Sequence, residues 1–303
     1  MKQIYFLTIG LFLAVLVTAH TARAAQTDIV GPAASNFGQT VTVLPNGNIV
    51  VTAPNYDIPA GAADVGAVYL YDGTTLALIS TLTGSTASDF VGSTGVTVLT
   101  NGNYVVSSSN WGNPSPAAVN AGAVTWCSAT TGCSGTVSAA NSLVGGTASD
   151  AVGNGGVTAL TNGNYVVRSQ FWDNGAIVDA GAYTLGNGAS GTSGGITNGT
   201  SGGNSVVGTV GSGTNTFAFD ATRNRLFVGR SASNIVSILS FNTTAIADGN
   251  LNNAANWSSG VPNALNTGII PSGRTMSISS VMTVGQIQVQ CGGNLTGGAA
   301  SAY

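Results

Sequence analysis

The sequence contains no glutamate, and its only lysine and histidine, Lys2 and His20, lie within the first 24 residues. Charged residues make up 6% of the 303 positions. Without a histidine beyond this leader, no imidazole can act as the base for a serine or cysteine nucleophile. Without glutamate, an acid–base pair would have to consist of aspartates alone. We therefore predict a chain that is not an enzyme and needs no cofactor.

The first 24 residues have the pattern of a secretory signal peptide. Lys2 precedes an apolar segment from Ile4 to Val17, and Ala22-Arg23-Ala24 forms a small-x-small cleavage site. A membrane anchor is the alternative, but the apolar segment is shorter than the roughly 20 residues of a spanning helix. We predict cleavage after Ala24, secretion or display at the cell surface, and no transmembrane segment in the mature chain.

The mature chain would carry five arginines and ten aspartates, a net charge of −5. Nucleic acids and anionic membranes need clustered basic residues, so neither is the expected partner. One basic group, Arg223, Arg225 and Arg230, lies in a strand-like segment. We interpret it as protection of a sheet edge rather than as a binding patch.

An internal repeat dominates the sequence. Residues 41–51 return in nearly the same form at 96–106 and 157–167, so the Asn-Gly pair stands at positions 46, 101 and 162. Spacings of 55 and 61 residues indicate an array of supersecondary units. The β-branched segments and glycine-rich turns indicate an all-β fold.

Each repeat is predicted to contain four strands. Asn-Gly between β-branched segments favours a two-residue type I′ hairpin, in which Leu44 faces Ile49 and Val43 faces Val50. Both faces of this hairpin are apolar, so we expect a cover on each side, as in a propeller blade or a solenoid coil. A third strand begins with Gly-Ala at 66, 122 and 181, and a fourth spans segments such as 76–82 and 136–144.

The repeats define the expected organisation of the chain. After the leader at 1–24, a β-propeller-like region at 25–247 contains about four blades, at 31–85, 86–145, 146–208 and 209–247. The β-rich segment 248–303 includes strands at 275–278 and 284–289, and it resembles the opening coils of the parallel β-helix domains of bacterial surface proteins. The segment is either complete or a fragment of a longer domain.

The frame of the first repeat resembles an FG-GAP repeat. It consists of Phe37-Gly38, Asn46 to Pro54, and Gly66-Ala67-Val68-Tyr69-Leu70-Tyr71. Such repeats build the β-propeller of integrin alpha chains and occur in bacterial haemagglutinin-like surface proteins, so the resemblance implies cell adhesion. Those propellers usually close with seven blades. About four blades here would close as a small propeller, stay open or lack the remainder.

The resemblance does not extend to calcium. FG-GAP blades often carry an aspartate-rich loop between the first two strands, whereas these loops are 45–48, 100–103 and 161–164, with no carboxylate. Calcium needs six to eight oxygen ligands, carboxylates among them. We therefore expect no metal site in the repeats.

Two pairs of aspartates recur. Asp89 and Asp150 occupy one repeat position beside a turn, which favours an Asx-type turn over catalysis. Asp57 and Asp173 share a position in the variable loop after the second strand. This second pair either binds a ligand or keeps the loop solvated.

The cysteines favour one disulfide. Cys127 and Cys133 flank a short connection between adjacent strands, and the aligned positions of the third repeat, Gly186 and Thr192, lack both cysteines together. Export makes an oxidised pair plausible. Two free thiols are the alternative, and Cys291 has no assigned partner.

The variable loops carry the candidate binding residues. They concentrate aromatic side chains, with aspartates beside two of them: Tyr56, Asp57, Trp111, Phe171, Trp172 and Asp173. Loops on a rigid scaffold are common binding sites, although these aromatics could instead cover the blade ends. We predict a non-catalytic adhesion module of a bacterial surface protein that binds an extracellular protein or glycan. The alternative is an accessory part of a larger secreted carbohydrate-active β-helix enzyme.

Overall fold

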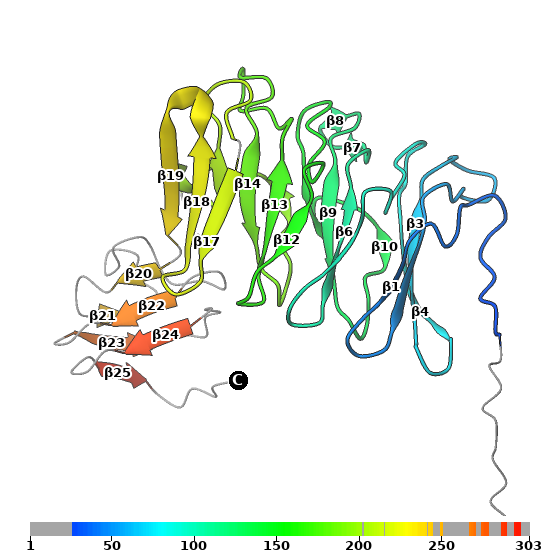
Figure 1. Cartoon of the computed structure of the whole chain (residues 1–303), viewed down its shortest axis with the longest axis horizontal. Helices are drawn as coiled ribbons and strands as arrows, with labels where there is room; N and C mark the ends of the chain where they lie inside the picture. The colour runs from blue at the N-terminus through cyan, green and yellow to red at the C-terminus, as the bar shows by residue number, and fades with distance from the viewer. Residues whose placement is uncertain are drawn as a thin grey trace, which may run out of the picture. The chain divides into compact units, whose positions relative to one another are not determined.

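The computed structural model describes residues 26–201, 203–214, 216–240, 242–244, 249–250, 267–270, 274–278, 286–289 and 294–297. The predicted signal peptide and Cys291 lie outside these residues. Within them the chain contains strands and two short 3-10 helices, η1 (Gly199–Ser201) and η2 (Ser231–Ser233), but no α-helix (Figure 1). The predicted all-β repeat architecture is confirmed.

Four antiparallel sheets follow one another along the chain, and we call them blades 1 to 4. Blade 1 consists of β1 (Val41–Val43), β2 (Ile49–Ala53), β3 (Ala67–Tyr71) and β4 (Leu78–Thr83). Blade 2 consists of β5 (Gly95–Val98), β6 (Tyr104–Ser108), β9 (Ala123–Cys127) and β11 (Ser142–Val144). Blade 3 consists of β12 (Val157–Ala159), β13 (Tyr165–Ser169), β14 (Ala182–Gly186) and β16 (Ser205–Val207). Blade 4 has three described strands, β17 (Thr216–Asp220), β18 (Arg225–Arg230) and β19 (Ile235–Ser240).

The first hairpin of blade 1 has a longer loop than predicted. Val43 pairs with Ile49, and the N–H of Leu44 donates to the carbonyl of Asn48 at 2.8 Å. The three residues between Leu44 and Asn48 form the loop, and the last of them, Gly47, has a φ of +91°, which glycine adopts without steric cost. The predicted two-residue turn and its pairing are therefore wrong. A three-residue loop that ends in a left-handed glycine fits the same Asn-Gly pair.

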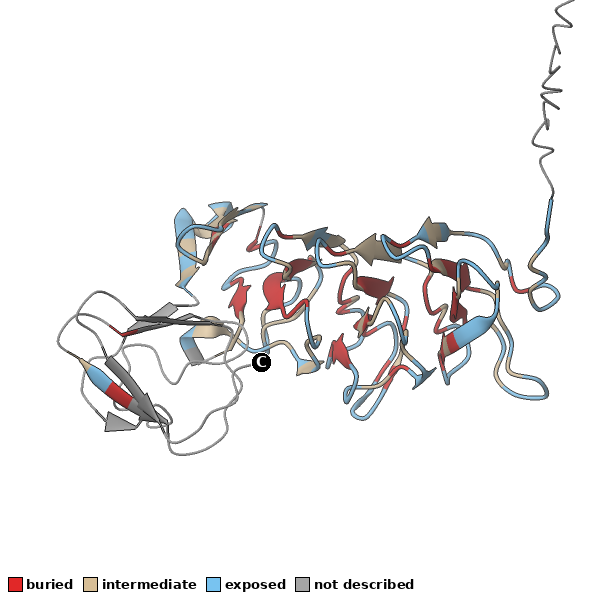
Figure 2. Ribbon diagram, turned by 90° about the horizontal axis from the view of Figure 1, so that it is seen from below, coloured by how far each residue is buried: buried red, intermediate tan, exposed pale blue. Residues whose placement is uncertain are grey.

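Neighbouring blades bury their facing apolar surfaces against each other. The central strands of blades 1 to 3 are almost wholly buried (red in Figure 2). Three clusters join the blades, and each draws residues from two of them: Leu70 and Tyr104 for blades 1 and 2, Val124 and Tyr165 for blades 2 and 3, and Leu185 and Leu226 for blades 3 and 4. The prediction of a cover on both faces holds for blades 2 and 3.

Blade 1 departs from that prediction, because among the described residues the outer face of its first strand is left open. Val41 and Val43 are 60% and 66% exposed. Phe37 covers the same blade further along, with its ring centroid 5.5 Å from that of Tyr69 and 6.3 Å from that of Tyr71. The first blade is thus capped only in part.

Short parallel strands connect successive blades at their outer edges. The segment after β9 first forms β10 (Gly135–Thr136), which pairs with β4 of blade 1, before the chain returns as β11. In the next repeat β15 (Gly194–Gly195) pairs in the same way with β11 of blade 2. The predicted single strand at 136–144 is therefore wrong, because its first residues belong to the neighbouring sheet.

The C-terminal strands form two parallel ladders (Figure 1). One contains β20 (Asn242–Thr244), β22 (Thr267–Ile270) and β24 (Gln286–Val289), and the other contains β21 (Gly249–Asn250), β23 (Thr275–Ile278) and β25 (Asn294–Gly297). Two parallel ladders that take strands in alternation are the arrangement of β-helix coils. The predicted β-helix-like segment is confirmed for these strands.

Candidate functional site

The recurring Asn-Gly-Asn turns clamp the next blade. The Nδ2 atoms of Asn46 and Asn48 both donate to the carbonyl of Ala129, each at 2.9 Å. The N–H of Ala129 in turn donates to Oδ1 of Asn103 at 3.0 Å. The backbone N–H and carbonyl of one residue, Ala129, are therefore held by asparagines of two successive repeats.

The same clamp returns one repeat later. Asn101 and Asn103 donate through Nδ2 to the carbonyl of Gly188 at 2.7 and 3.1 Å, and the N–H of Gly188 donates to Oδ1 of Asn164 at 3.0 Å. The result is a hydrogen-bond ladder that alternates between asparagine amides and backbone peptides across three repeats. A buried or half-buried amide with satisfied donors and acceptors fixes geometry more than it adds net stability.

The two recurring aspartates bond the turns that precede them. The predicted Asx-type turn is wrong in detail, because each carboxylate accepts the N–H groups three and four residues before it rather than the one two residues after it. Asp89, 1% exposed, accepts the N–H groups of Ser85 and Thr86 at 2.8 Å and that of Gly112 at 3.0 Å. These bonds tie the turn between two repeats to the variable loop of the second repeat. All three of these hydrogen bonds to the Asp89 carboxylate therefore come from backbone N–H groups.

Asp150 repeats this arrangement one blade on. Its carboxylate accepts the N–H groups of Gly146 and Thr147 at 2.8 Å and that of Asp173 at 3.0 Å. Burial, more than the nearby Asp173 carboxylate, raises the pKa of Asp150.

The six predicted binding residues are not alike in the structure. Trp111 is 0% exposed and belongs to the core between blades 1 and 2, and Trp172 packs against the core between blades 2 and 3. Tyr56 is half-buried, and its carbonyl accepts the N–H of Gly66 just as Trp111 and Trp172 accept from the corresponding glycines. Phe171 is 48% exposed. Of the four aromatic side chains, Phe171 is the most accessible to a partner.

The aspartates of these loops bond within their own loops. Asp57 is exposed, and its Oδ1 accepts the N–H of Asp64 at 2.7 Å. Oδ1 of Asp173 accepts the N–H of Asp179 at 2.8 Å. Both therefore shape the loop, and ligand binding by these six residues stays a prediction.

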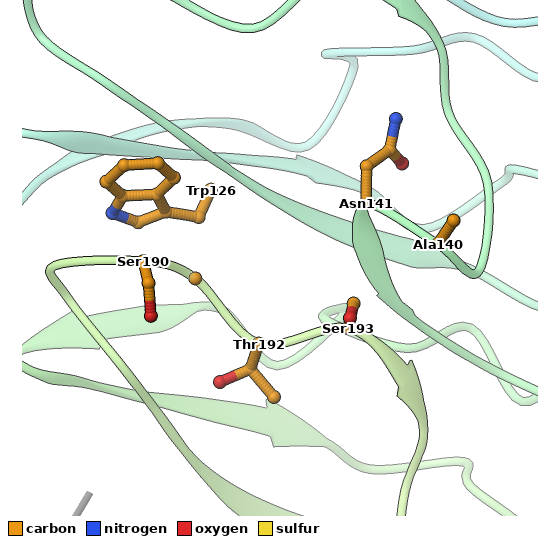
Figure 3. A pocket seen from close by; sticks show the side chains of 7 residues that line it. Trp126, Ala140, Asn141, Ser190, Thr192 and Ser193 are labelled. Carbon is orange, nitrogen blue, oxygen red and sulfur yellow. The ribbon is translucent and has the colours of Figure 1, made fainter. Parts of the chain in front are cut away.

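A groove that the sequence did not reveal lies between blades 2 and 3. It has a volume of about 290 Å³ and is lined by seven residues: Trp126, Ala140, Asn141, Ser190, Gly191, Thr192 and Ser193. Trp126 comes from β9 and lies beside the 190–193 segment, with Ala140 and Asn141 across the opening (Figure 3). All seven are uncharged, and one large aromatic side chain stands among hydroxyl and amide groups.

Trp126 occupies a position that is leucine in the neighbouring repeats. It pairs with Val105, whereas Leu70 pairs with Val50 and Leu185 with Val166. Both leucines are 0% exposed, whereas Trp126 is only half-buried. An alignment of the three Gly-Ala strands would have shown this difference, because each residue stands at the same distance from its Gly-Ala pair.

The predicted disulfide is present, and its cysteines pack in the core between blades 1 and 2. Cys127 and Cys133 are joined by an S–S bond of 2.00 Å, with 4.8 Å between their Cα atoms. Cys127 ends β9, directly after Trp126, and is fully buried. The bond closes the turn that presents Ala129 to the asparagine clamp.

The basic group near residue 225 does not protect a sheet edge, because β18 is the central strand of blade 4. The guanidinium of Arg225 lies 3.0 Å from Oδ2 of Asp220, and that of Arg223 lies 3.4 Å from the same atom. Arg230 donates to the carbonyl of Val207 at 3.2 Å, which connects blades 3 and 4. The edge-protection hypothesis was wrong because sequence alone did not give the strand order.

In the part of the chain that the structure describes, no three His, Cys, Asp or Glu side chains come together in a group that could hold a metal ion. Within the same residues, no helix has the length and apolar character needed to cross a membrane.

Three consecutive segments, 43–93, 98–154 and 159–214, match one family, described as "Repeat of unknown function (DUF5650)". Each match spans one Asn-Gly-Asn hairpin and one variable loop, and the first two matches also contain a buried aspartate, Asp89 and Asp150. No curated protein that was compared matches the chain.

Proposed function

Because the chain belongs to the DUF5650 family, a repeat of unknown function, we propose that its repeats form a non-catalytic binding scaffold displayed outside the cell. One observation carries this proposal. The recurring polar side chains are used for architecture: Asp89 and Asp150 each accept three backbone N–H groups, and Asn103 bonds two different blades. The aspartate and asparagine side chains that recur thus hold the repeats together.

The residues that vary between repeats are available for a partner instead. Exposed apolar side chains stand on the loops between the second and third strands, where Val119 is 72%, Phe171 48% and Val178 64% exposed. A rigid scaffold that presents variable loops is the usual design of a binding protein. This arrangement favours adhesion, as the FG-GAP and haemagglutinin-like resemblance implies.

An extracellular location is part of the proposal. The leader at 1–24 has the pattern of a cleaved signal, and the Cys127–Cys133 disulfide suits an oxidising compartment. Isolation of the protein from the medium or the cell surface, with a mature N-terminus near Ala25, would support export. Recovery of the intact chain from the cytoplasm alone would contradict it.

The adhesion test compares two equally apolar, exposed pairs of residues. Phe171→Ala with Val178→Ser alters one variable loop, and Val41→Ser with Val43→Ser alters the outward face of β1 as a matched control. We expect only the loop variant to lose attachment to host cells or extracellular matrix, with both variants keeping the parent's melting temperature within a few degrees. Equal attachment by the parent and the loop variant would refute a role for this loop.

A second candidate function rests on the parallel ladders β20-β22-β24 and β21-β23-β25. Such coils begin the β-helix domains of secreted polysaccharide-active enzymes, in which the repeats would be an accessory module. Sequencing the transcript past codon 303 and assaying the encoded protein on polysaccharides tests this alternative. Glycan cleavage that needs the downstream coils would favour it over adhesion alone.

A further inference from the structure

At the groove, the third strand of blade 2 carries a tryptophan where blades 1 and 3 carry a leucine. Leu70 and Leu185, its counterparts in blades 1 and 3, are fully buried between blades. Trp126 fills the same position with a larger ring and remains half-buried. Departures from a locally consistent pattern are where function is expected in a repeat protein.

The ring of Trp126 is held in one orientation. Its Nε1 donates to the carbonyl of Gly188 at 2.9 Å, the same carbonyl that the asparagine clamp holds. Gly191 lies against the tryptophan with a φ of +82°, and a Cβ at that position would come within 2.8 Å of the Trp126 Cβ. A glycine here therefore makes room for the tryptophan. A ring fixed before binding costs a ligand less conformational entropy.

The surroundings of the ring are polar but uncharged. Asn141 is fixed by bonds of its own, since Nδ2 donates to the carbonyl of Thr136 and Oδ1 accepts the N–H of Ser138, each at 2.9 Å. Ser190, Thr192 and Ser193 line the groove along the segment that lies beside Trp126 (Figure 3). A hydroxyl can both donate and accept, so this rim suits a ligand that carries hydroxyl groups.

From this geometry we infer that the groove binds a neutral carbohydrate, with one sugar ring stacked on Trp126 and its hydroxyls directed to the rim. This inference rests on the proposed binding function and names a ligand class for one site. Anionic or cationic ligands would lack a counter-charge among the seven lining residues. The volume of about 290 Å³ lies at the small end of ligand sites, which suits a short glycan segment.

The repeat itself supplies the test variant. Trp126→Leu installs the residue that blades 1 and 3 use, so we expect the variant to fold. The probes are neutral hexasaccharides of the cello, malto, xylo, manno and chito series, titrated by calorimetry and tryptophan fluorescence. We expect at least one to bind the full secreted chain, and the substitution to weaken that binding by about tenfold or more.

Two further variants keep the test decisive. Ser193→Leu leaves the core unchanged and blocks the opening, so it should also weaken binding by about tenfold or more; it decides the matter if Trp126→Leu does not fold. Leu78→Ser, which alters an exposed apolar residue of β4 in blade 1, should bind like the parent.

The experiments distinguish a failure of this inference from a failure of the proposed function. If no neutral hexasaccharide binds, or if Trp126→Leu and Ser193→Leu bind like the parent, the groove is not a sugar site. Adhesion that survives such a result would leave the proposed function standing. Binding of a charged glycan or a peptide alone at this groove would also overturn the inference.

Discussion

The interface between blades 1 and 2 and the interface between blades 2 and 3 share a polar clamp but differ in their apolar contents. In both, two asparagine amides hold one backbone carbonyl, that of Ala129 in the first and that of Gly188 in the second. In the first, Leu70 is completely buried, whereas in the second Trp126 lines an open groove. The asparagine hydrogen bonds are the same in both interfaces, while the residue at the position of Leu70 and Trp126 differs. The comparison teaches that these hydrogen bonds allow this one residue to vary while the blades remain packed against each other.

The largest effect should come from the buried aspartates, which both interfaces need. Replacement of Asp89 or Asp150 by alanine leaves three backbone N–H groups without their acceptor, which should cost about 3 kcal/mol in the free energy of unfolding. Urea unfolding measures this value. Asp57→Ala, which removes one bond of an exposed carboxylate, is the control and should have a small effect. Equal losses in all three variants would contradict the account.

The disulfide should come next, because it supports only the turn that carries Ala129. Reduction of the Cys127–Cys133 bond should lower the free energy of unfolding by about 2–3 kcal/mol, as expected for a short closed loop. A Cys127→Gly, Cys133→Thr variant, with the residues of the third repeat, should not respond to reductant. A parent protein that reductant leaves unchanged would show that the bond is dispensable.

The clamp asparagines should have a smaller effect, and a graded one. Asn103 accepts from Ala129 and donates to Gly188, so it bonds two blades, whereas Asn164 accepts from Gly188 in its own blade. Asn103→Ala should cost about 2 kcal/mol and Asn164→Ala about 1 kcal/mol. Thermal or urea unfolding of both variants gives the ranking, and a larger loss for Asn164→Ala would reverse it.

The smallest effect concerns pH. Burial raises the pKa of Asp150, so the folded chain keeps this proton to higher pH than the unfolded chain. Between the two pKa values the folded state binds more protons, and the contribution of Asp150 to stability falls as pH rises through that interval. The free energy of unfolding of the parent, minus that of Asp150→Asn, should therefore decrease as pH rises from below the unfolded pKa. A difference that grows with pH would mean the opposite shift.

Sequence alone predicted the features that depend on local chemistry. Alternating β-branched residues, Gly-Ala segments and Asn-Gly turns gave the strands of blades 1 to 3, and the paired loss of Cys127 and Cys133 in the third repeat gave the disulfide. Strands β23 and β24 were also predicted, because they alternate regularly.

Features that depend on contacts between repeats were missed. The two-residue strands β10 and β15 have no side-chain pattern of their own, since backbone pairing with the preceding blade alone defines them. The loop with Trp111 looked exposed, but its aromatic ring completes the core between blades 1 and 2. The groove at Trp126 was hidden because a tryptophan in a strand resembles any other core residue until its leucine counterparts are aligned.

A nitrogen-15 NMR titration of the secreted chain with the neutral hexasaccharides tests most directly whether binding occurs where blade 2 departs from the repeat. The account predicts that the indole Nε1–H signal of Trp126 shifts on addition of a bound sugar, while those of Trp111 and Trp172 stay in place. Signals that do not move, or that move only at the turns of Asp89 and Asp150, would contradict it.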